Sequence, residues 1–286
     1  MALDSQLGIP VKHVSETAYY VAALRALESQ RDDALFKDPY AETLCGPEGL
    51  ALLDKIPHGR DGVWFMAVRT KVLDDFILEA IRDRHIGVVV NLATGLDTRP
   101  YRLSLPKDLK WIEVDFSPVV DAKTHALKAF EPQCVLERVG LNLVERELRQ
   151  RFFRQVGAEG KKVLVLTEGL LNYLEESDVT YLAHDLKDLL HVDCWMMDQV
   201  VPQFLEWAKE RWGSTLKDSD VRFKFSAQSG NQFFLSLGWN LERFVSYSEA
   251  CEKFQRLPPD ALFQSPLIRE GLSQSGLLSL VPRREC

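Results

Sequence analysis

The chain has 286 residues, 46% of them hydrophobic, which is enough to bury the core of one α/β domain with a modest additional subdomain. Its formal net charge is -7 and no long run of Lys and Arg occurs, which argues against a nucleic-acid-binding protein. The first residues lack the basic and apolar segments of a signal peptide, and no apolar stretch is long enough to cross a membrane. We therefore expect a soluble, cytoplasmic protein that binds neither nucleic acid nor a membrane.

The cysteines and histidines do not form a metal-binding pattern. The six histidines are dispersed, and none of the five cysteines belongs to a C-x-x-C motif; the cysteines are Cys45, Cys134, Cys194, Cys251 and Cys286. We expect reduced thiols and no metal site.

The first predicted elements in chain order are helices. Ser15 is expected to cap a helix that continues to about Ser29, and Asp38-Pro39 to start a short helix that ends at Gly46-Pro47. A loop is predicted over residues 59–62. A long amphipathic helix is predicted from Trp64 to Arg82.

The next segment has the pattern of a nucleoside-binding βαβ unit. A buried strand is predicted over Val88–Leu92, followed by a turn of small residues that contains Gly95. The following strand, Lys110–Asp115, ends in a carboxylate 20 positions after that glycine. An acid at this place is typical of folds that hold the ribose hydroxyls of a nucleotide.

The remaining elements alternate between strands and helices, which predicts a doubly wound, mainly parallel sheet. The expected elements are a helix from Ser117 to about Phe130, strands at Cys134–Val139, Lys162–Thr167 and Cys194–Met197, a helix capped by Ser177, a helix at Pro202–Trp212, a polar loop at Leu216–Gly230, and a terminal strand pair at Phe244–Val245 and Leu277–Val281 around a Ser248-capped helix.

Four motifs carry a family resemblance. The string from Val90 to Leu103, VNLATGLDTRPYRL, resembles the "GAGLDTRAYRL" motif of the leucine carboxyl methyltransferase family and its bacterial polyketide O-methyltransferase relatives. FKDPY at Phe36–Tyr40, WIEVD at Trp111–Asp115 and TEGLLNYL at Thr167–Leu174 are also similar to motifs of that family. The resemblance covers residues 15 to about 255.

The resemblance implies a seven-stranded, Rossmann-like methyltransferase fold with a reversed last strand. It divides the chain into an N-terminal helical cap, residues 1–62, and an S-adenosyl-L-methionine-dependent methyltransferase domain, residues 63–286. In the family, a basic residue of the cap and an arginine of an "ARTR" segment grip the carboxylate of the cofactor's methionine, and Arg25 and Arg69 match them. The full set of expected cofactor-binding residues is Arg25, Arg69, Ala93, Gly95, Asp97, Asp115, Phe116, Gly140, Leu141, Glu168 and Gly169.

Two positions depart from the family pattern. The family shows Asp-Leu after its third strand, where the acid meets the adenine amino group, but this chain has Gly140-Leu141. Backbone groups or Asn142 would have to replace that acceptor. Ala93 stands in place of the family's first glycine.

Three functions compete at this stage: O-methylation that depends on S-adenosyl-L-methionine, an NAD-dependent dehydrogenase, and a nucleoside-binding protein without catalysis. A dehydrogenase needs G-x-G-x-x-G to receive a pyrophosphate, whereas Ala93–Thr98 has only one glycine. Asp97 would also repel a phosphate. Carboxylates at Asp97 and Glu168 suit the ammonium and sulfonium groups of S-adenosyl-L-methionine, so the sequence favours a methyltransferase.

The acceptor is expected to be the carboxylate of a small, polyketide-like acid. A carboxylate is ionised at neutral pH, its reference pKa being about 4, so its methylation needs no general base. Methylation of a protein's C-terminal carboxylate and of a hydroxyl group are the alternatives. Tyr173, on the short helix after Glu168, is the candidate catalytic residue that would hold the acceptor. The sequence leaves the oligomeric state open.

Overall fold

The computed structural model describes residues 14–56, 58–188, 192–206, 223–259 and 265–283. Within these residues, seven strands form one sheet in the order β3-β2-β1-β4-β5-β7-β6. The strands are β1 (Val88–Leu92), β2 (Lys110–Asp115), β3 (Val135–Gly140), β4 (Val163–Thr167), β5 (Val192–Gln199), β6 (Trp239–Ser246) and β7 (Gly276–Pro282). Strands β3, β2, β1, β4 and β5 pair in parallel in that order, and β7 runs antiparallel to both of its neighbours, β5 and β6. The predicted fold class and the reversed last strand are confirmed.

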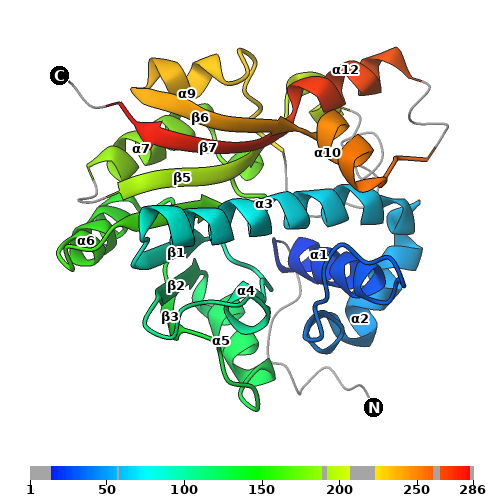
Figure 1. Cartoon of the computed structure of the whole chain (residues 1–286), viewed down its shortest axis with the longest axis horizontal. Coiled ribbons are helices and arrows are strands. Elements are labelled where there is room, and N and C mark those ends of the chain that lie inside the picture. The colour runs from blue at the N-terminus through cyan, green and yellow to red at the C-terminus, as the bar shows by residue number, and fades with distance from the viewer. Residues whose placement is uncertain (1–13, 57, 189–191, 207–222, 260–264, 284–286) are drawn as a thin grey trace.

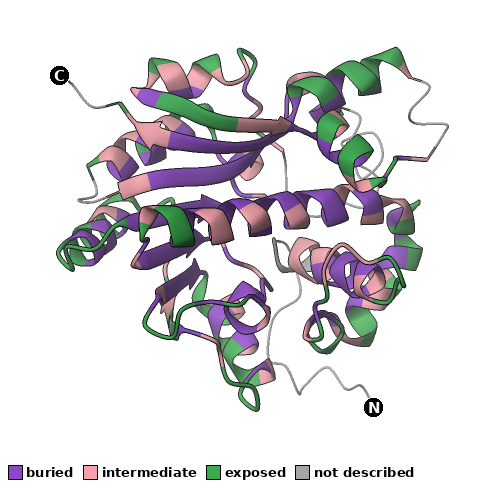
Figure 2. Cartoon of the chain, viewed as in Figure 1, coloured by how far each residue is buried: buried purple, intermediate pink, exposed green. Residues whose placement is uncertain are grey.

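Side chains that alternate along the strands pack into two cores, one on each face of the sheet. Val89 and Leu164 point into a cluster with α3 (Val63–Arg84), α10 (Tyr247–Phe254) and α12 (Pro266–Gln274). Val88 and Val165 point the other way, into a cluster with α6 (Arg146–Gly157), α7 (Glu176–Lys187) and α9 (Gln232–Ser236). Figure 1 shows α3 crossing one face of the sheet, and Figure 2 shows how completely the central strands are buried.

A third cluster joins the N-terminal helices to the first half of the sheet. It contains residues of α1 (Val14–Ser29) and α2 (Ala41–Lys55), which pack on one another beside α3 (Figure 1), together with Met66, Leu96 and Tyr101. Three short helices connect the larger elements: η1 (Gly59–Gly62), α4 (Arg99–Arg102) and η2 (Leu171–Tyr173). Helix α5 (Ser117–Ala126) follows β2. The boundary predicted after residue 62 coincides with the start of α3, but the division into two domains stays a prediction.

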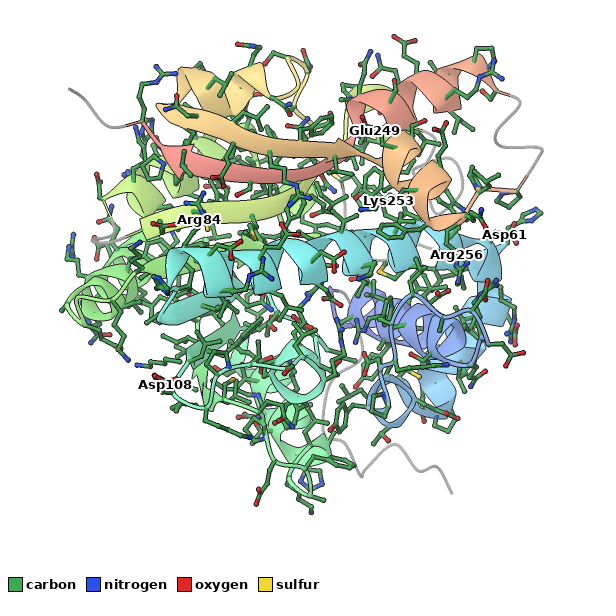
Figure 3. All side chains as sticks on the ribbon, in the orientation of Figure 1. Asp61, Arg84, Asp108, Glu249, Lys253 and Arg256 are labelled. Atoms are coloured by element: carbon green, nitrogen blue, oxygen red, sulfur yellow. The ribbon has the colours of Figure 1, made fainter. Side chains whose placement is uncertain are left out.

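Two arginines labelled in Figure 3, Arg84 and Arg256, form ion pairs that join separate elements. Arg84, at the end of α3, donates to Asp193 of β5 at 2.7 Å. Arg256, just after α10, donates to Glu28 of α1 at 3.0 Å and to Asp33 at 3.0 Å. Arg256 and Glu28 are buried, so this pair ties the N-terminal helices to the C-terminal part of the chain.

The expected end of the second helix at Gly46-Pro47 is wrong. α2 begins at Ala41 instead of Pro39, bends at Gly46, where φ is 57°, and continues to Lys55. Proline at the first position of a helical segment lacks an N–H that would be unpaired there anyway. Gly46-Pro47 therefore restarts the helix after a kink.

Three predicted helix caps are also wrong. Ser15 lies inside α1, which includes Val14. The N-cap of α7 is Glu175, so Ser177 lies inside the helix. The N-cap of α10 is Ser246, which forms a capping box with Glu249, and Ser248 lies in the first turn. Ser246 and Ser248 are two positions apart, which makes the cap of α10 ambiguous from sequence.

Some predicted segments are only partly described. Residues 202–206 are helical, but the rest of the helix expected to Trp212 and the first part of the loop expected from Leu216 lie outside the described residues. α6 was not predicted, because its sequence is rich in charge; its buried side includes Phe152, Phe153 and Val156.

Candidate functional site

A cavity of about 350 Å³ lies at the carboxyl ends of the parallel strands, between the sheet and helices α1 and α3. Residues at or just after the ends of β1, β2, β4 and β5 line it, which is where open α/β sheets bind their ligands. The volume is that of a small-molecule site. The lining includes these predicted site residues: Arg25, Arg69, Ala93, Gly95, Asp97, Asp115, Phe116, Leu141, Glu168, Gly169 and Tyr173.

The turn after β1 is braced by the carboxylate at the end of β2. Asp115 accepts a hydrogen bond from the Gly95 N–H at 2.7 Å and one from the Phe116 N–H at 2.8 Å. Burial raises the pKa of Asp115, and the two N–H donors oppose that rise. A phosphate at this turn would meet the Asp115 charge instead of an unpaired N–H, which disfavours the dinucleotide alternative.

The backbone of Ala93 is strained. Its φ is 54°, in the left-handed region that glycine adopts without a steric penalty. This is the position where the family has glycine, so the departure seen in the sequence has a conformational consequence.

We predict that Ala93→Gly raises the free energy of unfolding by about 0.5–1 kcal/mol. Relief of the left-handed strain, about 1–2 kcal/mol, outweighs the added entropy of glycine in the unfolded chain. Ala158 is a matched control, because it is exposed and has a φ of -66°. In chemical denaturation, Ala158→Gly should leave stability unchanged or lower it, and an equal response of both variants would contradict the prediction.

Gly140 was expected to bind the cofactor, but it does not line the cavity. It pairs with Asp115 across β2 and β3, and the adjacent Leu141 and Asn142 line the cavity in its place. A Cβ at Gly140 would lie 2.3 Å from Ser117 Oγ and 3.1 Å from Ser117 Cα. The family's aspartate would therefore require Ser117 to shift in this chain.

Gly140→Ala should lower the free energy of unfolding by about 1–3 kcal/mol, the usual effect of overpacking. The double variant Gly140→Ala, Ser117→Gly should recover most of that loss, because it removes the atoms that clash. A thermodynamic cycle from denaturation curves measures the coupling. Additive effects of the two substitutions would contradict the steric explanation.

A continuous network of arginines and carboxylates forms the polar floor of the cavity, and all of its members except Asp38 and Asp74 line the cavity. Its members are Arg25, Arg69, Arg99, Arg102, Asp38, Asp74, Asp97, Glu168 and Asp198, which we call the arginine–carboxylate network. Four guanidinium groups face five carboxylates, so the network has one net negative charge.

The centre of the network joins α3 to the tips of β4 and β5. Arg69 donates to Glu168 at 2.8 Å and to Asp198 at 3.3 Å, and Arg99 donates to the other oxygen of Glu168 at 2.7 Å. Burial would raise the pKa of Glu168, but Arg99 and Arg69 hold it below its usual value. Burial raises the pKa of Asp198, which also accepts the Gly169 N–H at 2.6 Å.

Two predicted cofactor ligands have structural partners within the network. Arg25 donates to Asp38 at 2.9 Å and to the Leu96 carbonyl at 2.5 Å, so it fixes α1 against the turn. Asp97 accepts hydrogen bonds from Asn91 and Arg99. Both residues also line the cavity, and their contact with the cofactor stays a prediction.

Tyr173 lies on η2 and lines the cavity, as its predicted position requires. Its ring stacks on Phe223 with centroids 5.3 Å apart, and its hydroxyl is hydrogen-bonded to Thr17 of α1. Burial raises the pKa of Tyr173 to about 12. The phenol is therefore neutral at physiological pH and offers a hydrogen bond rather than a base.

Other chemistry is limited in the described part of the chain. Cys45, Cys134, Cys194 and Cys251 are buried free thiols, and burial raises the pKa of each. Among the described residues, no group of His, Cys, Asp or Glu is arranged to hold a metal ion. No described helix is long and apolar enough to span a membrane.

Sequence reasoning missed Asp198, Arg99, Asp74 and Arg102 as parts of the site. Arg99 and Arg102 stood inside the motif already recognised, LDTRPYRL, but they were not assigned a role. Asp198, like Glu168, is an acid near the end of a buried strand, and this pattern could have identified it.

Comparison with solved structures shows a methyltransferase-like α/β fold. A crystal structure described as "a putative methyltransferase" from Thermobifida fusca aligns with a TM-score of 0.63 and 17% identity over 98% of this chain and 97% of that one. A DUF574 family protein from Streptomyces avermitilis aligns with the same TM-score at 14% identity, over 97% of this chain and 100% of that one.

The chain belongs to the leucine carboxyl methyltransferase family, whose model matches residues 18–186. Two relatives are named "Putative S-adenosyl-L-methionine-dependent methyltransferase". The one from Mycolicibacterium gilvum is 37% identical over 56% of this chain, which spans 58% of that relative's length. The one from Mycolicibacterium smegmatis is 29% identical over 80% of this chain and 84% of its own. The predicted family and its cofactor class, S-adenosyl-L-methionine, are confirmed.

Proposed function

We propose that this protein transfers the methyl group of S-adenosyl-L-methionine to the carboxylate of a small-molecule acid. The observation that carries the proposal is the arginine–carboxylate network at the strand tips of the cavity. It presents opposite charges within one small site, as a zwitterionic amino-acid group requires. The cofactor supplies an electrophilic methyl group bonded to a positively charged sulfur.

The charges of the site fit that cofactor. S-adenosyl-L-methionine carries an ammonium, a sulfonium and a carboxylate, hence a net positive charge, which complements the net negative charge of the network. Arg69 would hold the carboxylate, and Glu168 or Asp198 the ammonium. Asp115 would hold the ribose hydroxyls. The carboxylate of Asp115 has acceptor positions left beyond its two backbone hydrogen bonds.

An acid acceptor needs no general base, and the carboxylates of Glu168 and Asp198 already accept hydrogen bonds from Arg69. The acceptor oxygen would form its bond to the methyl carbon while the carbon–sulfur bond breaks and its electron pair stays on sulfur. No proton has to move, because the acid is already ionised. Rate would come from alignment of oxygen, carbon and sulfur in a cavity that excludes water, an effect worth about 7–11 kcal/mol.

A hydroxyl acceptor is the second candidate, and Asp198 favours it. This carboxylate lines the cavity, is buried, and has a raised pKa, which are properties of a general base. Its ion pair with Arg69 opposes that rise in pKa, however, and lowers its basicity. The acid therefore remains the first candidate.

Transfer of a labelled methyl group tests the proposal directly. The protein, labelled S-adenosyl-L-methionine and a panel of carboxylic acids and phenols should yield base-labile methyl esters from acids. Base-stable ethers from phenols would replace the acid with the hydroxyl acceptor. Calorimetry should show binding of S-adenosylhomocysteine and none of NAD, and the reverse result would overturn the proposal.

Tyr173→Phe should lower kcat/KM on the accepted acid by one to two decades. If its hydroxyl holds the acceptor carboxylate, its removal takes away one charge-assisted hydrogen bond worth about 1.5–3 kcal/mol. Affinity for S-adenosylhomocysteine should not change. Since the pKa of Tyr173 is about 12 and an acid needs no base, kcat should stay flat from about pH 6 to 9. A steep rise with pH, with the variant equal to wild type, would contradict the assignment.

A further inference from the structure

We propose that the acceptor is an acid with a flat, apolar body, bound against a wall of aromatic side chains at the β5 side of the cavity. This inference rests on the proposed function and adds the class of acceptor. The aromatic wall consists of Trp64, Phe65, Tyr173, Phe204 and Phe223, all of which line the cavity.

The two halves of the cavity differ in chemistry. The half at β1, β2 and β3 contains the Gly95 turn, Asp115 and Asn142, which supply polar and backbone groups for a nucleoside. The half beyond β4 is formed by the first turn of α3, the residues after β5, and η2. The aromatic wall belongs to this second half. A cofactor anchored at Asp115 and Arg69 would leave the wall to the acceptor.

The rings of the wall are ordered by contacts with one another. Phe65 of α3 stacks on Phe204 with centroids 5.3 Å apart and planes inclined by 26°. Trp64 meets Phe65 edge-on at 5.6 Å. On η2, Tyr173 stacks on Phe223 at 5.3 Å with the same 26° inclination. Such surfaces bind a planar apolar group by stacking, at little cost in side-chain entropy.

The wall leads to a polar end. The Arg69 guanidinium carbon lies 5.9 Å from the centre of the Phe65 ring. Thr70, the next residue of α3, also lines the cavity; it is 1% exposed, and its hydroxyl has no hydrogen-bond partner in the described structure. A buried hydroxyl without a partner costs about 1–3 kcal/mol, which a ligand's polar group would offset. With Arg69 left to the cofactor, an apolar body whose carboxylate accepts a hydrogen bond from Thr70 matches this sequence of groups.

The test measures binding of 1-naphthoate and acetate by calorimetry in the presence of saturating S-adenosylhomocysteine. Both probes carry the same charge, and they differ in the planar apolar body. Naphthoate should bind at least about 100-fold more tightly, since it buries the extra ring surface. Equal affinities would overturn the inference.

Matched variants locate the effect. Phe223→Leu removes a half-buried ring from the wall. Phe76→Leu removes a buried ring of α3 that belongs to the core and does not line the cavity. We expect Phe223→Leu to weaken naphthoate about fivefold and Phe76→Leu to leave it within twofold. An equal response of the two variants would overturn the inference.

The same samples separate this inference from the proposed function. Binding of naphthoate that depends on Phe223, without formation of labelled naphthoate ester from S-adenosyl-L-methionine, supports the wall and contradicts carboxyl methylation of this class of acid. Formation of methyl esters on acetate and naphthoate with equal kcat/KM supports carboxyl methylation and overturns the wall.

Discussion

Arg69→Met should lower the free energy of unfolding by about 3–5 kcal/mol at pH 7. The substitution keeps the length of the side chain but leaves Asp198, whose side chain is 4% exposed, without its cationic partner, whereas Glu168 keeps its ion pair with Arg99. Removal of one partner of a buried ion pair is far more destabilising than loss of an exposed one, because an uncompensated charge stays buried. Thermal and chemical denaturation measure the change.

Two further variants separate charge from geometry. Arg69→Lys keeps the charge but loses the planar fork of donors, so we expect an intact fold and a raised KM for S-adenosyl-L-methionine. Arg69→Met combined with Asp198→Asn removes the stranded charge and should lose less stability than Arg69→Met alone. A loss below about 1 kcal/mol for Arg69→Met would show that the pair behaves as an exposed one. Unchanged kinetics of Arg69→Lys would restrict Arg69 to packing.

The sequence predicted the sheet because its strands are short, rich in β-branched residues and separated by helices. The residue at the end of each strand can be identified from the local sequence alone. Asp115 is the last residue of β2, and Glu168 comes directly after β4. Parallel pairing then brings these ends together at one edge, as the observed register of β1 with β2 and β4 does. The motif of the family added the strand order and the reversed β7.

The network could not be predicted in the same way, because its geometry is not local. Arg69 and Asp198 are 129 positions apart, and Arg69 and Glu168 are 99 apart. Nothing in the pattern around Arg25 says that its guanidinium would turn to Asp38 and Leu96. Gly140 shows the same limit, since its clash partner, Ser117, lies on another element.

Asp115→Ala should weaken binding of S-adenosylhomocysteine at least tenfold. If Asp115 accepts hydrogen bonds from both ribose hydroxyls, each bond to the charged group is worth about 1.5–3 kcal/mol. The substitution also leaves the Gly95 and Phe116 N–H groups without the carboxylate that now accepts their hydrogen bonds. Part of the loss of affinity would therefore come from the turn. A comparison of affinities alone therefore does not distinguish a ligand from a brace.

A cycle with two probes makes the distinction. Adenosine carries both ribose hydroxyls, and 2′,3′-dideoxyadenosine lacks them while it keeps the base. Wild-type protein should bind adenosine at least tenfold more tightly, whereas Asp115→Ala should bind the two probes about equally, because the coupling between hydroxyls and carboxylate is then absent. A turn that is merely loosened would weaken both probes by the same factor. If wild-type protein does not discriminate between the probes, Asp115 serves the turn alone, and the ribose must be held by groups elsewhere along the cavity.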